Sequence, residues 1–186
     1  TQSRQFLYDL TRNLGQVLDA NGRTSTFAYD AANQLTSKVL RDASAAVQDS
    51  VTYAYDTAGN LTLAQDTDSK LTFAYDALGR LLDARTGNPA TPALAQPVTQ
   101  LVFRYDSRGN RISRRDPTGF ATLTTYAYDP LSRLTAMASG TSAFAFAYDA
   151  LSRRTRLTLP SGVAALAGYD DARQLVGAGL QVVAGL

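Results

Sequence analysis

The sequence contains no histidine, no cysteine and no tryptophan, no glutamate and a single methionine. Without cysteine it has no disulfide and no thiolate metal site. The absence of histidine, cysteine and glutamate together removes the usual nucleophile–base pairs and most metal-ligand sets. The sequence therefore predicts a protein that is not an enzyme and that holds no cofactor and no metal ion.

Long apolar runs are also missing, so no transmembrane helix is expected, and no signal peptide is visible. The formal charge of +2 is nearly balanced, which gives little support for a nucleic-acid partner. All sixteen acidic residues are Asp, and only two of the 18 basic residues are Lys, so two common helix formers are scarce or absent. Tyr, Phe, Thr and Val are well represented and favour strands.

The dipeptide Tyr-Asp occurs eight times, at spacings of 20 to 30 residues, which is typical of a repeat architecture. The sequence predicts a single array of eight repeats, near 6–21, 27–38, 51–66, 71–86, 101–116, 124–138, 144–159 and 165–180. Neither end has the polar character of a capping repeat, so we expect a segment of a longer array.

The clearest repeat is 71–81, in which Leu71, Phe73 and Tyr75 alternate with small residues as in a half-buried strand. Asp76 then starts a turn, and Leu81 begins a second strand. Each repeat is thus predicted to be a β-hairpin. Roughly sixteen strands at about 4.8 Å each give an all-β antiparallel sheet about 75 Å wide. A sheet of that width is expected to curl or spiral.

The turn after each Tyr has a mixed composition. The fourth residue after the repeat Tyr is Gly in three repeats and Arg, Asn or Ser in the others. Arg12 and Arg173 are the two arginines at this position. Because Arg rarely adopts a positive φ, we expect the turn type to vary among repeats. The next position is always Asn, Gln or Arg, whose N–H groups can bind the turn Asp or a loop carbonyl. The predicted structural motif comprises Tyr8, Asp9, Tyr29, Asp30, Tyr55, Asp56, Gly59, Tyr75, Asp76, Gly79, Tyr105, Asp106, Gly109, Tyr128, Asp129, Tyr148, Asp149, Tyr169 and Asp170.

Two segments lengthen the period and are predicted to be loops. Residues 82–100 contain Pro89, Pro92 and Pro97, and residues 39–51 contain a run of small residues.

The segments 55–61, 75–81 and 105–111 resemble the RHS/YD-repeat motif, Tyr-Asp-x-x-Gly-Arg/Asn-Leu, and the resemblance covers essentially the whole chain. It implies a spiralling sheet of strand-turn-strand repeats. In bacterial members such as Tc toxins, polymorphic Rhs toxins and wall-associated proteins, the sheet closes around a toxic C-terminal domain. Animal teneurins use the same shell for adhesion.

The resemblance implies a shell segment of a secreted or cell-surface bacterial protein that encapsulates a toxic cargo. Its partners would be the remainder of its own shell and the enclosed cargo domain. Bacterial shells of the family often end in an Asp-Pro-x-Gly motif linked to autoproteolysis. Residues 116–119 have these letters, but they lie between ordinary repeats, and we interpret them as a type I turn.

An alternative function is that of a cell-surface structural or adhesive protein, which self-assembles through open sheet edges or binds carbohydrate on its aromatic residues. Other candidates have simpler interpretations. Asp66 and Asp68 suggest Ca²⁺ but suit a solvated turn better, and Asn60 opens a glycosylation sequon that coincides with the repeat turn. The arginines of 104–115 suggest a basic patch, yet they stand among ordinary repeat positions.

Overall fold

The computed structural model describes residues 3–88, 99–118 and 122–182. The chain divides into two compact units, an N-terminal unit (Thr1–Gln100) and a C-terminal unit (Leu101–Leu186). These residues form strands and turns without any helix, so the described ranges offer no helix that could cross a membrane.

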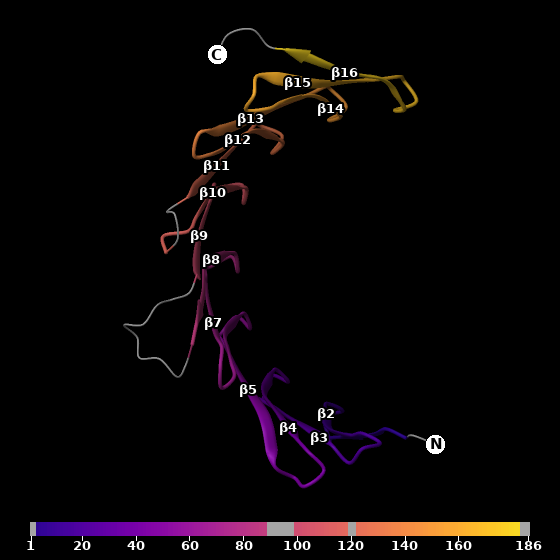
Figure 1. Cartoon of the computed structure of the whole chain (residues 1–186), viewed down its shortest axis with the longest axis vertical. Helices are drawn as coiled ribbons and strands as arrows, with labels where there is room; N and C mark the ends of the chain where they lie inside the picture. Colours follow the sequence, from indigo (N-terminus) through magenta and orange to yellow (C-terminus); the bar gives the residue numbers. More distant parts are fainter. Residues whose placement is uncertain (1–2, 89–98, 119–121, 183–186) are drawn as a thin grey trace. The chain divides into compact units, whose positions relative to one another are not determined.

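The N-terminal unit is a meander in which every strand pairs antiparallel with the strand that precedes it in sequence (Figure 1). Its strands are β1 (Gln5–Tyr8), β2 (Leu14–Leu18), β3 (Thr24–Tyr29), β4 (Leu35–Arg41), β5 (Val47–Tyr55), β6 (Leu61–Gln65), β7 (Lys70–Tyr75) and β8 (Leu81–Gly87).

The C-terminal unit repeats the same meander. Its strands are β9 (Thr99–Tyr105), β10 (Arg111–Arg115), β11 (Leu123–Tyr128), β12 (Leu134–Ser139), β13 (Ser142–Tyr148), β14 (Arg154–Thr158), β15 (Val163–Tyr169) and β16 (Leu175–Val182). The predicted all-β array of antiparallel hairpins is confirmed, whereas the curling of the sheet stays a prediction.

The two predicted loops are largely wrong where the structure describes them. Strand β8 continues to Gly87 and β9 begins at Thr99, so both ends of the segment 82–100 are strand. The prolines of that segment lie outside the described residues. Segment 39–51 is strand except for a tight turn at 42–46. The Asp42 carboxylate accepts the amide N–H groups of Ser44 at 2.9 Å and Ala46 at 3.0 Å, which closes the turn without a longer loop.

Each Tyr-Asp hairpin contains a β-bulge directly after its turn. In β7 and β8, Tyr75 lies opposite Leu81, but Ala74 lies opposite Asp83, so Leu82 is an extra residue. The same register shift occurs in all eight Tyr-Asp hairpins. Such a bulge bends its strand and increases the local right-handed twist.

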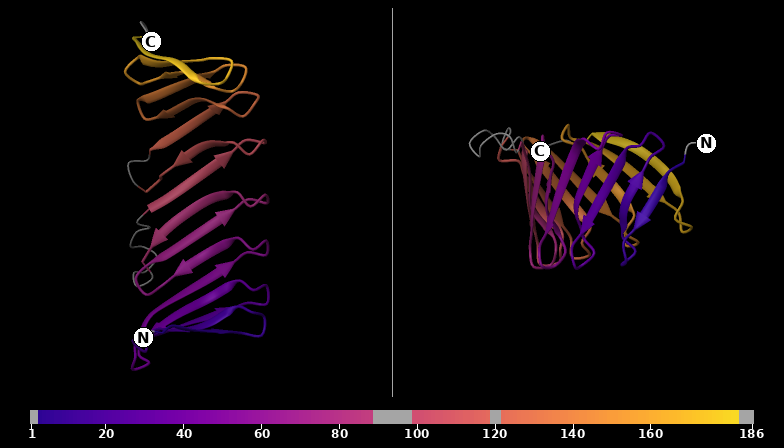
Figure 2. Two further views of the ribbon diagram at one scale, coloured as in Figure 1. Left: turned by 90° about the vertical axis from the view of Figure 1, so that its right-hand side faces the viewer. Right: turned by 90° about the horizontal axis from the view of Figure 1, so that it is seen from below.

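In a meander, successive turns alternate between the two ends of the strands. In each unit, the Tyr-Asp turns therefore lie in a row at one end of the strands, and the second turns lie in a row at the other end (Figure 2). The register also assigns two faces. The aromatic face carries the repeat Tyr, the aromatic residue two positions earlier and the residue that begins the next strand, such as Leu81 opposite Tyr75. The opposite face carries mainly small residues, such as Thr72 and Ala74, and we call it the small-residue face.

Neither face is covered by the described residues, and each unit is a single layer. Among these residues the only buried apolar side chains are Phe103 and Ala164, and Thr124 is the only buried polar one. Sheets ordinarily bury at least one face against another layer. Each unit is therefore stabilised within its own layer, by strand pairing, cross-strand packing and the turns.

Candidate functional site

The eight Tyr-Asp turns form the most regular side-chain arrangement in the structure. At 76–80, the Asp76 amide donates to the Arg80 carbonyl and the Gly79 amide donates to the Asp76 carbonyl, both at 2.9 Å. The Asp76 Oδ1 atom accepts the amides of Leu78 at 2.9 Å and Arg80 at 3.0 Å. One carboxylate thus closes the loop that two backbone hydrogen bonds define.

The turn type does not vary, contrary to the expectation from sequence. All eight turns have the same backbone hydrogen-bond pair, and the fourth residue after Tyr has a positive φ whether it is Gly, Asn, Ser or Arg. Arg12 and Arg173, at φ 67° and 66°, take the conformation that Gly59 takes at 85°. The Asp-centred hydrogen bonds fix the loop strongly enough to place an L-residue in this unfavourable region.

The residue that follows was predicted in every repeat to bind the turn Asp or a loop carbonyl, and in five repeats its side chain binds the Asp of its own turn. Asn60 and Asn110 donate Nδ2 to Oδ2 of Asp56 and Asp106, each at 2.9 Å. The guanidinium Nε atoms of Arg80, Arg133 and Arg153 donate at 2.6 Å to the carboxylate Oδ2 atoms of Asp76, Asp129 and Asp149 respectively.

The same column also reaches forward to the next turn. Arg133 Nη1 donates to the Asp149 carbonyl at 2.9 Å, and Arg153 Nη1 donates to the Asp170 carbonyl at 2.7 Å. In the N-terminal unit, Asn13 Nδ2 donates to Asn33 Oδ1 at 2.8 Å. These side chains link neighbouring turns along the row of Tyr-Asp turns, and we call this arrangement the turn ladder.

The repeat tyrosines add a second set of links that the sequence did not indicate. Five of their hydroxyls donate to the backbone carbonyl of the residue that begins the second strand of the preceding hairpin. These bonds, at 2.9 to 3.1 Å, are Tyr29 to Leu14, Tyr55 to Leu35, Tyr128 to Arg111, Tyr148 to Leu134 and Tyr169 to Arg154. The recurrence of Tyr in every repeat was the available signal, but it does not reveal which carbonyl accepts the hydrogen bond.

Arginines also stack on these tyrosines. The Arg133 guanidinium carbon lies 5.0 Å from the Tyr148 ring centroid, and that of Arg153 lies 4.8 Å from the Tyr169 centroid. Each of these arginines thus contacts its own Asp, the next turn and the next Tyr.

In six of the eight turns, hydrogen bonds lower the pKa of the carboxylate and so favour its charged form. The Arg80 amide, which outweighs the opposing effect of burial, lowers the pKa of Asp76 below its ordinary value, and the Arg133 amide does the same for Asp129. The Asn60 side chain is the main cause that lowers the pKa of Asp56. The hydrogen bonds that lower these pKa values are the same ones that close the turn, as expected for a carboxylate with a structural role.

Two of the remaining candidates from the sequence, Asp66 and Asp116, lie in turns. Asp66 accepts the amides of Asp68 at 2.8 Å and Ser69 at 2.6 Å, and no cluster of metal-ligating side chains occurs in the residues that the structure describes. Asp116 accepts both the amide and the hydroxyl of Thr118, as a turn residue does, and the end of its Asp-Pro-x-Gly segment lies outside the described residues.

The Teneurin YD-shell family model matches residues 3–163 of the chain. A search of curated proteins finds no match. Among solved structures, the chain is similar to TcdB2-TccC3-Cdc42, with a TM-score of 0.74 and 20% identity, over 96% of this chain and 10% of that chain.

It is also similar to the Photorhabdus luminescens Tc holotoxin pore with a TccC3 mutation, at a TM-score of 0.74 and 19% identity, over 93% of this chain and 10% of that one. For the crystal structure of TcdB2-TccC3 the TM-score is 0.63 and the identity 22%, over 97% and 9% of the two chains. The chain spans about one tenth of the chains that it matches, and the likeness is one of fold.

Proposed function

The chain belongs to the teneurin YD-shell family, and on that premise we propose that it is one segment of a shell wall that encloses a toxic cargo domain. The similar solved structures are Tc toxin assemblies, which supports a secreted bacterial toxin as the setting. The partners would be the rest of the same shell and the cargo. The chain itself would act sterically and not as an enzyme.

The observation that carries this proposal is a single layer whose hairpins are bonded in series. In the C-terminal unit, consecutive turns are linked by the turn ladder and consecutive hairpins by Tyr hydroxyls. In the N-terminal unit, the Asn13 side chain and the hydroxyls of Tyr29 and Tyr55 make links of the same kind. No second layer covers either face of the described residues, and large apolar side chains stay exposed. Such a sheet is suited to be a wall with one face toward solvent and the other toward an enclosed chain.

Cysteine labelling tests the wall role, because the chain has no cysteine of its own. Ser25 lies on the aromatic face, opposite Val17 and Leu40, whereas Ser37 lies on the small-residue face, opposite Ala28. In a cysteine-free full-length protein, a bulky maleimide should label only one of the variants Ser25→Cys and Ser37→Cys. The isolated chain, with both faces open, should be labelled at both. Equal labelling of both sites in the full-length protein would rule out an enclosing wall.

The edge strand β16 supports a second candidate function, self-assembly of a structural or adhesive protein. β16 pairs with β15, and no other described strand pairs with it. Its Leu175, Val176, Leu180 and Val182 are between 59% and 78% exposed. Long exposed apolar edges favour edge-to-edge pairing. Sedimentation velocity should then show association that Leu180→Lys abolishes, and a protein that stays monomeric at high concentration excludes this function.

A further inference from the structure

The C-terminal unit has an unusual distribution of charge. It contains ten Arg and six Asp, and all six Asp lie in turns. Its strands carry six arginines and no acidic residue, namely Arg104, Arg111, Arg114, Arg115, Arg154 and Arg156. None of these six forms an ion pair with a residue that the structure describes. The sheet of this unit is therefore basic between its two rows of turns.

Two of these arginines replace the repeat leucine that begins the second strand of a hairpin. Six repeats have Leu at this position, as at Leu134, whereas the other two have Arg111 and Arg154. The position lies opposite the repeat Tyr, so both arginines are on the aromatic face, and both are exposed. Each of these arginines replaces an apolar side chain by an exposed positive charge that an anion from outside the sheet can reach.

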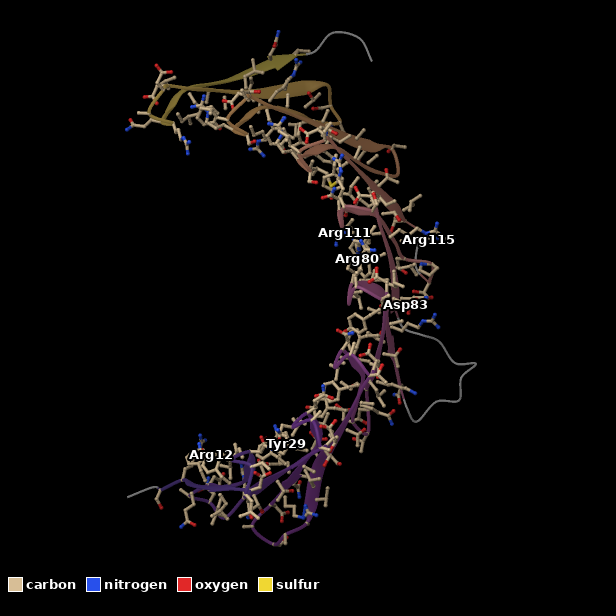
Figure 3. The ribbon with its side chains drawn as sticks, turned by 180° about the vertical axis from the view of Figure 1, so that it is seen from behind. Arg12, Tyr29, Arg80, Asp83, Arg111 and Arg115 are labelled. Carbon is tan, nitrogen blue, oxygen red and sulfur yellow. The ribbon has the colours of Figure 1, made fainter. Side chains whose placement is uncertain are left out.

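Arg111 is held in place for such an anion. Its guanidinium carbon lies 5.7 Å from the Phe103 ring centroid and 5.0 Å from that of Tyr126. Arg114, on the same face, lies opposite Phe103 and Thr124. Figure 3 shows Arg111 and Arg115 on opposite sides of the ribbon. Stacking fixes the plane of the Arg111 guanidinium, which suits a carboxylate that binds its N–H groups in pairs.

The aromatic face between β10 and β14 carries mainly aromatic and apolar side chains. Residues that lie on it include Tyr126, Met137, Phe144 and Phe146. Since Arg111 and Arg154 stand at the same position four strands apart, they are separated by about 19 Å at 4.8 Å per strand. An extended peptide covers that distance in about six residues.

We propose that the aromatic face of β10–β14 binds an extended polypeptide segment whose acidic residues, about six positions apart, flank an apolar stretch. Arg111 with Arg114 binds one end of the segment and Arg154 binds the other. A peptide fits better than a single-stranded nucleic acid, because Arg111 already stacks on the Phe103 and Tyr126 rings that bases would need. The inference rests on this unit alone and does not depend on the wall role.

Fluorescence polarisation with a labelled peptide of this pattern tests the proposal. The intact chain should bind it in a salt-dependent way, and a peptide with Lys in place of the acidic residues should not bind. The double variant Arg111→Leu/Arg154→Leu should weaken binding about tenfold or more, since it removes charge-assisted contacts. It restores the residue that six other repeats have, so the fold should survive. Arg115→Leu, on the small-residue face, is the matched control and should leave binding unchanged.

Several outcomes would overturn the proposal. These are no binding of the acidic peptide, equal loss in the Arg115→Leu control, or unchanged affinity in the double variant. Tighter binding of an oligothymidine that the same double variant abolishes would assign the face to nucleic acid instead. If the double variant does not fold by circular dichroism, Arg111→Gln and Arg154→Gln replace it, and they should weaken binding in the same way.

Discussion

At the scale of single residues, the Asp of the repeat controls the turn more than the residue with positive φ does. A left-handed conformation costs a residue other than Gly roughly 1–2 kcal/mol, yet Arg12 and Arg173 adopt it in turns that share the backbone hydrogen bonds of the glycine-containing ones. What the eight turns have in common is the aspartate. Its carboxylate orders the loop regardless of the residue that must take the strained conformation.

We expect Asp76→Ala to disturb its hairpin more than Gly79→Ser. The Asp76 variant loses two amide hydrogen bonds and the contact with Arg80. Gly79→Ser reproduces Ser132 and Ser152, which occupy the same position with positive φ, and its Cβ would have only an ordinary contact with Asn60. Limited proteolysis at 76–80 measures the difference, and faster cleavage of the Gly79 variant would contradict it.

Gly59 should be less tolerant than Gly79. A Cβ at residue 59 would lie 2.8 Å from Gln34 Nε2, whereas at residue 79 the nearest atom, Asn60 Oδ1, is 3.5 Å away. Gly59→Ser must therefore displace the Gln34 amide in addition to the conformational cost of about 1 kcal/mol that both variants share. Urea unfolding should show the larger loss for Gly59→Ser. In a Gln34→Ala background the two losses should become equal, and a persistent difference would show that Gln34 is not the cause.

At the scale of the strands, hairpins are joined by more than their backbone ladder. The Tyr148 hydroxyl donates to the Leu134 carbonyl at 2.9 Å, which ties β13 to the start of β12. Leu134 is the residue beside the bulge, where the ladder is interrupted. The tyrosine hydroxyls thus satisfy a carbonyl at the point where the strand pairing is weakest.

Tyr148→Phe should lower the free energy of unfolding by about 1 kcal/mol, the usual net value of one hydrogen bond. Tyr53→Phe is the matched control. The Tyr53 hydroxyl has no hydrogen bond with the described residues, so its removal should change stability by much less. Denaturant unfolding of the two variants compares them directly. Equal effects would mean that the hydroxyl bond does not stabilise the sheet.

The strands themselves were predictable from the sequence, and the contacts between repeats were not. Alternation at Leu71, Phe73 and Tyr75 together with Asp76 identifies a hairpin, because period and turn chemistry are local properties. The uniform turn at Arg12 was missed because propensity alone disfavours it, and the hydrogen bonds that override it are visible only in three dimensions. The same is true of the short turn at Asp42, where a carboxylate replaces an expected loop.

At the scale of the whole molecule, charge is carried almost entirely by Asp and Arg, and neither residue type ordinarily titrates near neutral pH. The chain has no Glu and no His, so no side chain with an ordinary pKa changes charge between about pH 5 and 8. Backbone hydrogen bonds of the turn keep the pKa of Asp76 and of Asp129 below the ordinary value of 3.8.

Stability should therefore be constant from about pH 5 to pH 8 and fall below about pH 4. A carboxylate with a lowered pKa in the folded state contributes stability that is present above the ordinary Asp pKa. That contribution is lost as the pH falls through the lowered value, because the unfolded chain binds protons first. Thermal unfolding from pH 2 to pH 8 measures this. A transition between pH 5 and 8 would be inconsistent with it, and Asp76→Asn should reduce the loss in acid.

The links between neighbouring repeats join each hairpin to the hairpins directly before and after it in sequence. Arg133 and Arg153 extend toward the turn that follows them, and Tyr148 extends back to a carbonyl of the hairpin that precedes it. During synthesis, a hairpin that emerges from the ribosome would thus pair with a preceding hairpin whose hydrogen-bond donors and acceptors are already positioned. The protein can grow from its N-terminus by adding one hairpin at a time, and no step has to wait for a segment that has not yet been translated.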